Sequence, residues 1–94
     1  MMDLINERND FMDENVRIER GKVMEQINQM YFLGIMSPKW YGDIDTMFNT
    51  YGFSNEIMAM LFEYCHKRNA LNTNYVLAVA KTWYNNDVKT KRAL

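Results

Sequence analysis

The sequence predicts an all-α protein, folded as a compact bundle of four to five helices. The 94 residues include one proline and four scattered glycines, and so few helix breakers argue against a β-sandwich. Nine methionines with 2 Trp, 6 Tyr and 5 Phe supply bulky core material. Apolar residues recur at helical spacing along most of the chain, and short polar or glycine-containing segments separate the runs. A chain of this length makes one small domain at most.

Composition also limits the cellular setting. The single Cys65 cannot form an internal disulfide, so nothing indicates an oxidising compartment. No apolar run approaches the roughly 18 residues of a membrane-spanning helix, and the acidic N-terminus does not resemble a signal peptide. We therefore expect a cytoplasmic protein with no membrane partner.

Residues 1–36 are predicted to form an N-terminal helical segment, either an arm or an extra helix. One helix is expected from about residue 13 to residue 33, with Gly34 as its stop. Upstream residues could form a short helix or a frayed arm, and pairing with a second copy through the long helix is one use of its apolar face. The residues at helical spacing are Val16, Val23, Ile27, Met30 and Tyr31.

Residues 37–94 are predicted to form the main helical domain. Ser37-Pro38 is the clearest helix start, since Ser can cap and Pro fits the first helical position. Gly52 ends that helix and Ser54 opens the next, which runs to Lys67. The remaining signals are a cap at Asn72, Thr73 or Asn74, a break at Asn85-Asn86-Asp87, and Thr90 as the cap of a further helix.

The last predicted helix carries the feature most suggestive of function. Tyr75, Val79 and Trp83 are four apart and so form one slightly drifting stripe on a helix. Net charge is −3 for residues 1–36 (4 basic, 7 acidic), −3 for residues 37–66 (1 basic, 4 acidic) and +5 for residues 67–94 (6 basic, 1 acidic). An aromatic stripe beside cations is typical of a nucleic-acid surface, but it is equally compatible with the inner face of a core helix. The candidate nucleic-acid-binding residues are Tyr75, Lys81, Trp83, Lys89, Lys91 and Arg92.

The sequence contains no pattern typical of an enzyme, a metal site or a cofactor site. Cys65 and His66 are adjacent, so on a helix they point about 100° apart, and the chain has no second Cys or His for a zinc site. The glycines are too widely spaced for a phosphate-binding loop. Asp43 and Asp45 diverge on a helix and do not form a carboxylate pair. We expect a non-catalytic protein.

The stripe and its surroundings resemble the C-terminal domain shared by the DnaD and DnaB replication-initiation proteins of Gram-positive bacteria and their phages. That family has a motif in which Tyr, Ile and Trp are spaced four residues apart and are followed by a short turn and a Thr. The corresponding residues here are Tyr75, Val79, Trp83 and Thr90. The run YGFSNEI from Tyr51 to Ile57 resembles its loop-plus-helix signature. The resemblance covers residues 37–90; Val79 replaces the Ile, and the winged-helix domain of full-length members is not present.

The resemblance implies a helical, non-enzymatic module of a primosome or helicase-loading protein. In that family the Tyr/Ile/Trp helix and the segment after it are associated with single-stranded DNA, and protein partners would be initiator, helicase or helicase-loader proteins or a second copy. The alternative is a purely protein-interacting adaptor or dimerisation domain that does not bind DNA.

Overall fold

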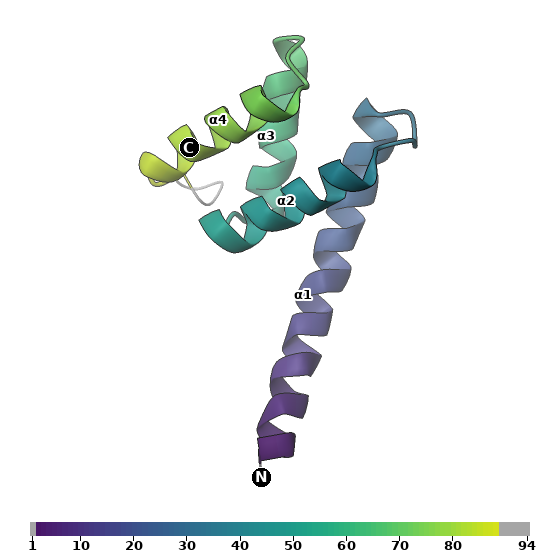
Figure 1. Ribbon diagram of the computed structural model, residues 1–94, viewed down its shortest axis with the longest axis vertical. Coiled ribbons are helices and arrows are strands. Elements are labelled where there is room, and N and C mark those ends of the chain that lie inside the picture. The colour runs from purple at the N-terminus through teal and green to yellow at the C-terminus, as the bar shows by residue number, and fades with distance from the viewer. Residues whose placement is uncertain (1, 89–94) are drawn as a thin grey trace.

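The computed structural model describes the backbone of residues 2–88 and the side chains of residues 14–88. Residues 2–88 form four helices and no strand (Figure 1): α1 (Met2–Tyr31), α2 (Pro38–Tyr51), α3 (Asn55–Lys67) and α4 (Thr73–Asn85). The all-α prediction is therefore confirmed. The helix expected to begin near residue 13 begins at Met2 instead. No proline or glycine occurs in the first 20 residues, so helix propensity continues where apolar periodicity is weak.

α1 ends in a tight turn that returns the chain toward α2. The main-chain oxygen of Asn28 accepts hydrogen bonds from the N–H groups of Phe32 (3.0 Å) and Gly34 (3.1 Å). Leu33 and Gly34 both have left-handed backbone conformations, with φ of 58° and 81°. The predicted stop at Gly34 is confirmed, because glycine adopts this conformation without steric penalty.

The other helices begin at the predicted residues. Ser54 Oγ accepts from the N–H of Ile57 (3.1 Å), and Asn72 Oδ1 accepts from the N–H of Tyr75 (2.9 Å), so both side chains cap their helices. Ser37 occupies the position before α2, but its side chain makes no capping hydrogen bond. Gly52 ends α2 with φ of 66° and donates its N–H to the Phe48 oxygen.

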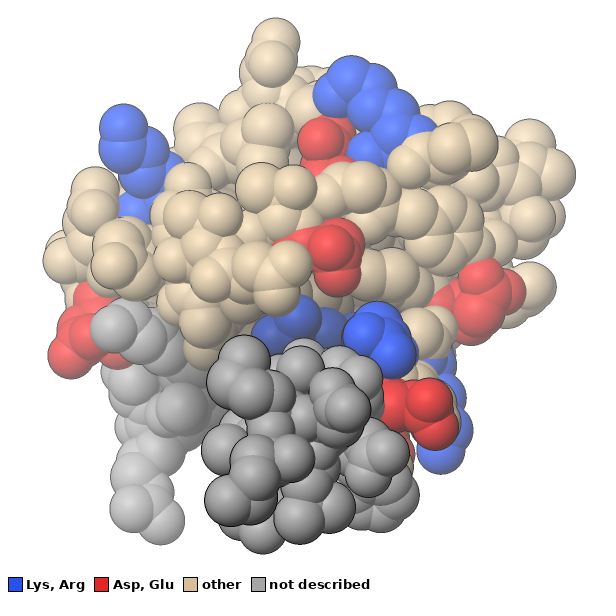
Figure 2. Space-filling model, turned by 60° about the horizontal axis from the view of Figure 1, so that its bottom comes forward, with Lys and Arg blue, Asp and Glu red and all other residues tan. Residues whose placement is uncertain are grey.

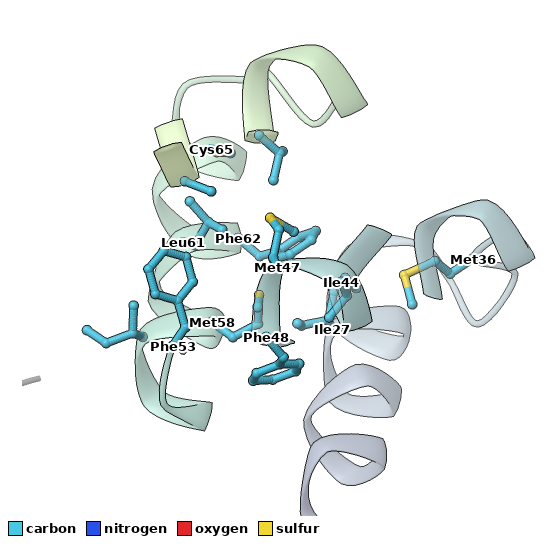
Figure 3. Close-up of a cluster of buried hydrophobic side chains, with 13 residues drawn as sticks. Ile27, Met36, Ile44, Met47, Phe48, Phe53, Met58, Leu61, Phe62 and Cys65 are labelled. Atoms are coloured by element: carbon cyan, nitrogen blue, oxygen red, sulfur yellow. The ribbon is translucent and has the colours of Figure 1, made fainter. Parts of the chain in front are cut away.

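The core lies where the end of α1 meets α2, α3 and α4 (Figure 3). α3 is the central helix: it packs against α1 on one side and α4 on the other, while α2 packs against α4. The thirteen buried apolar residues are Ile27, Met36, Ile44, Met47, Phe48, Phe53, Ile57, Met58, Leu61, Phe62, Cys65, Val76 and Ala80. Residues 1–36 thus contribute Ile27 and Met36 to the same core as residues 37–88.

The first half of α1 extends beyond the other helices (Figure 1). A helix of 30 residues is about 45 Å long, which accounts for most of the 51 Å long axis of the molecule. Residues 14–19 are exposed, although Val16 and Arg17 line a shallow hollow shared with Asp45 and Asn49 of α2, and Arg20 donates a hydrogen bond to Asn49. α1 is therefore part bundle helix and part projecting arm.

Candidate nucleic-acid interface

The aromatic stripe of α4 lies along the edge of the core rather than inside it. Val76 and Ala80 are fully buried and form the inner face of the helix. Tyr75, Val79 and Trp83 are half-buried and pack against the core from the side. The core interpretation therefore applies in part, because each stripe residue contacts the core and retains some exposed surface. The nucleic-acid interpretation stays a prediction.

Trp83 forms one wall of a groove between α3 and α4. Its ring meets the Tyr64 ring edge-on, with centroids 5.6 Å apart and an interplanar angle of 72°. The Arg68 guanidinium carbon lies 3.7 Å from the centre of the Tyr64 ring, a cation–π contact. The groove has a volume of about 570 Å³ and is hereafter the Trp83 groove; it is lined by Met60, Glu63, Tyr64, Lys67, Arg68 and Trp83.

The side chains that line the Trp83 groove carry a net charge of +1. Lys67 and Arg68 supply two cations, and Glu63 supplies one carboxylate. Lys67 Nζ lies 3.6 Å from Glu63 Oε2, and the two side chains are 72% and 56% exposed. Exposed pairs of this kind are worth little, so a phosphate group could readily compete for Lys67. The groove offers an aromatic face and two cations at the C-terminal end of α3, where the helix dipole also favours cations.

The candidate residues chosen from the sequence do not share one surface. Trp83 lines the groove, whereas Tyr75 is half-buried two turns earlier on α4. Lys81 is exposed, but it precedes Trp83 by two residues, so the two side chains leave the helix about 160° apart. Lys89, Lys91 and Arg92 lie outside the described residues. Their roles as DNA contacts stay predictions.

The candidate residues named from the sequence include Trp83 but not the groove residues Tyr64 and Lys67 on α3 or Arg68 at its C-cap. Tyr64, Lys67 and Arg68 are spaced i, i+3 and i+4, so they share one face of a helix. An aromatic residue followed at that spacing by two cations, where the helix ends, is the signal that could have identified them.

Residues 14–88 contain one Cys and one His, at the adjacent positions Cys65 and His66. Within that range no three His, Cys, Asp or Glu side chains are grouped as metal ligands. Cys65 is fully buried, and burial raises the pKa of its thiol. His66 packs instead against Tyr31, with ring centroids 4.8 Å apart.

Charged residues of both signs are mixed on one face of the molecule. Figure 2 shows this face, on which Lys and Arg occur at several places with Asp and Glu among them. Selective binding of an anion on this face therefore depends on local grouping of cations.

Comparison with known proteins gives one match. The sequence model of the family DnaB_2, described as replication initiation and membrane attachment, matches residues 23–94. No curated protein and no solved structure gives a significant match. Among the described residues, no helix is both long enough and apolar enough to cross a bilayer. The match spans most of the chain and includes α2, α3 and α4 entirely. The chain therefore belongs to the DnaB_2 family of replication-initiation proteins and contains the DnaD-like domain that its aromatic stripe predicted.

Proposed function

We propose that this chain is a non-catalytic replication-initiation module that binds single-stranded DNA in the Trp83 groove. The observation that carries the proposal is the grouping of two aromatic rings, Tyr64 and Trp83, with Lys67 and Arg68 in one open groove. The proposal places the protein in the cytoplasm, in contact with initiator, helicase or helicase-loader proteins as well as DNA.

Single-stranded DNA suits this groove better than a duplex does. An unpaired base can stack on an exposed aromatic face, an interaction worth about 1–3 kcal/mol per base and largely independent of sequence. Trp83 is partly exposed and so can offer such a face. Lys67 and Arg68 lie in the same groove, where they can bind the phosphates on either side of a stacked base. In a duplex the base faces are covered, so that only the phosphate contacts would remain.

A titration with a fluorescently labelled oligonucleotide at several salt concentrations tests the proposal. Each phosphate contact to a single strand contributes a log–log salt slope of about −0.7, so two contacts predict a slope of about −1.4 and four predict about −2.8. A slope steeper than about −1.4 is expected if any of Lys89, Lys91 and Arg92 also bind, reaching about −3.5 if all three do. Tighter binding to a particular duplex than to any single strand would contradict the proposal.

The chain offers a matched control for the groove lysine. Lys22 pairs with Glu19 on α1 at 3.6 Å, with exposures of 70% and 57%, which nearly reproduces the Lys67–Glu63 pair. Lys67→Ala and Lys22→Ala therefore remove the same charge from equivalent surroundings. We expect Lys67→Ala to weaken DNA binding several-fold and to reduce the magnitude of the salt slope by about 0.7, and Lys22→Ala to change neither. Equal losses would mean that only net charge matters.

The alternative function, a protein-interacting adaptor without DNA binding, is decided by the same titration. If the parent protein binds no single strand even at low salt, the Trp83 groove is not a DNA site. The adaptor function then becomes the better account of this family member.

A further inference from the structure

We propose that the end of α1 and the turn after it form a self-complementary surface through which two copies of this chain pair. Three of the large apolar side chains that are exposed among the described residues lie within this short stretch. Met30 is 62% exposed, Leu33 is 86% exposed and Ile35 is 81% exposed. Apolar side chains concentrated in this way mark an interaction site more often than scattered ones do.

The turn that carries these side chains is held in a fixed shape. Asn28 is 5% exposed, and its side-chain oxygen accepts a hydrogen bond from the N–H of Met36 at 2.8 Å. Its side-chain nitrogen donates to the hydroxyl of Tyr41 at 3.1 Å. Within the turn, the N–H of Ile35 donates to the oxygen of Phe32 at 3.0 Å.

Leu33, Gly34 and Ile35, the 33–35 tip, are thus presented by a preorganised turn. Leu33 adopts φ of 58°, a conformation that disfavours leucine, yet its side chain gains no burial from it. Because the turn is already ordered, a partner that covers the tip would lose little conformational entropy on binding.

A groove that could receive such a tip lies beside it. This α1–α3 groove has a volume of about 240 Å³ and is lined by Gln26, Ile27, Met30, Tyr31, Ala59, Met60 and Glu63. An apolar cavity of about 150 Å³ accommodates benzene, so this groove has room for a leucine or isoleucine side chain. Met30 and Met60 make its walls adaptable. Met30 also lies three residues before Leu33, which places the groove next to the tip.

A second copy of this chain is the occupant that the surface fits. A two-fold dimer needs one patch that contains both halves of each contact, and here a projecting tip and a hollow lie side by side. Charge is compatible with this pairing: Lys39 follows the tip, is 69% exposed and pairs with Asp43 at 3.0 Å, while Glu63 at the groove is 56% exposed and pairs with Lys67 at 3.6 Å. Ion pairs with exposed members are weak, so either can exchange its partner. The tip of one copy would bring its Lys39 toward the Glu63 of the other. The two tip-and-groove contacts would bury little surface area, so the dimer should be weak and reversible.

Sedimentation equilibrium from roughly 10 μM to 1 mM tests the proposal. The parent chain should show a reversible monomer–dimer equilibrium. The double variant Leu33→Asp/Ile35→Asp should dissociate at least about tenfold more readily, and aspartate tolerates the left-handed conformation at position 33. Ala59→Glu should dissociate the dimer similarly by filling the groove.

A matched control and a mixing experiment make the test specific. Ile18 is 50% exposed on α1 and lines neither groove, so Ile18→Asp should dimerise like the parent. The tip variant keeps an intact groove, and Ala59→Glu keeps an intact tip. A mixture of the two variants should form a heterodimer, in which the tip of the Ala59→Glu copy occupies the groove of the tip variant. Each variant alone should stay monomeric. A monomeric parent, an equal effect of Ile18→Asp, or failure of the mixture to associate would overturn the proposal. Because none of these outcomes involves DNA, the proposed function is tested separately.

Discussion

Trp83 packs against the core and, in the proposed function, also contacts DNA. The ring packs against the core on one side and against Tyr64 on the other, with part of its surface left exposed. Phe62 offers a useful contrast, because it is fully buried and its ring contacts those of Phe32 and Trp40. Replacing Trp83 and Phe62 in turn compares the stability contributed by a partly buried ring with that contributed by a fully buried one.

We expect Trp83→Ala to lower the free energy of unfolding by about 1–3 kcal/mol and Phe62→Ala by about 3–5 kcal/mol. Trp83→Phe should retain most stability and part of the DNA affinity, because it keeps a ring at the same position. Urea denaturation and oligonucleotide titration on the same three variants provide the measurements. If Trp83→Ala is as destabilising as Phe62→Ala, the tryptophan is primarily a core residue.

Cys65 illustrates how burial controls reactivity. Its side chain is fully buried, and burial raises the pKa of the thiol, an effect only partly opposed by Arg68. The reactive thiolate is therefore scarce and inaccessible in the folded protein. The raised pKa also links stability to pH: its contribution is present below the unfolded-state value, near 9.0, and is lost as pH rises through the folded-state value.

We expect Cys65 to react with a disulfide reagent at neutral pH at least about tenfold more slowly in the native protein than in urea. The free energy of unfolding should decrease as pH rises above roughly 9. Reaction kinetics and urea titrations at several pH values measure both effects. Equal rates in the native and unfolded protein would show that the helix face carrying Cys65 opens readily.

At the scale of the helix, local signals predicted the starts of α2, α3 and α4 well. Ser37-Pro38, Ser54 and Asn72 all precede helices, since each signal acts within one turn and needs no distant residue. The Trp83 groove could not be predicted in the same way, because it depends on how α3 and α4 cross. The length of α1 was also missed, since a helix that projects beyond its neighbours needs no apolar periodicity.

The three residues that precede α2, α3 and α4 differ in whether their side chains make a capping hydrogen bond. Ser54 and Asn72 accept a main-chain N–H, whereas the Ser37 side chain does not. We expect Ser54→Ala and Asn72→Ala each to lower stability by about 1 kcal/mol, or about 4–8 °C in melting temperature. Ser37→Ala should change stability by less than about 0.5 kcal/mol. Thermal unfolding followed by circular dichroism compares them, and an equal effect of Ser37→Ala would contradict this assignment.

At the scale of the whole molecule, the fold is a bundle to which only part of α1 belongs. Arg20 contacts α2, with its guanidinium carbon 4.7 Å from the centre of the Phe48 ring and its Nη1 2.7 Å from Asn49 Oδ1. Further along the helix, Ile27 and Asn28 are buried. The family match begins at residue 23, close to the point where α1 enters the core. The sequence alone suggested a division after residue 36, because the helix signals are clearest from Ser37 onward.

Truncation tests where the cooperative folding unit begins. A chain starting at residue 14 should melt within a few degrees of the parent, because it keeps the hollow that Val16, Arg17 and Arg20 share with α2 and the Arg20–Asn49 hydrogen bond. A chain of residues 37–94 should lose most of its stability, since removal of Ile27 and Met36 opens the core at two places and each large apolar deletion costs about 2–5 kcal/mol. Thermal unfolding of both chains beside the parent provides the measurement. If residues 37–94 unfold cooperatively at a temperature near that of the parent, the predicted boundary after residue 36 is correct and α1 is an accessory to an independent domain.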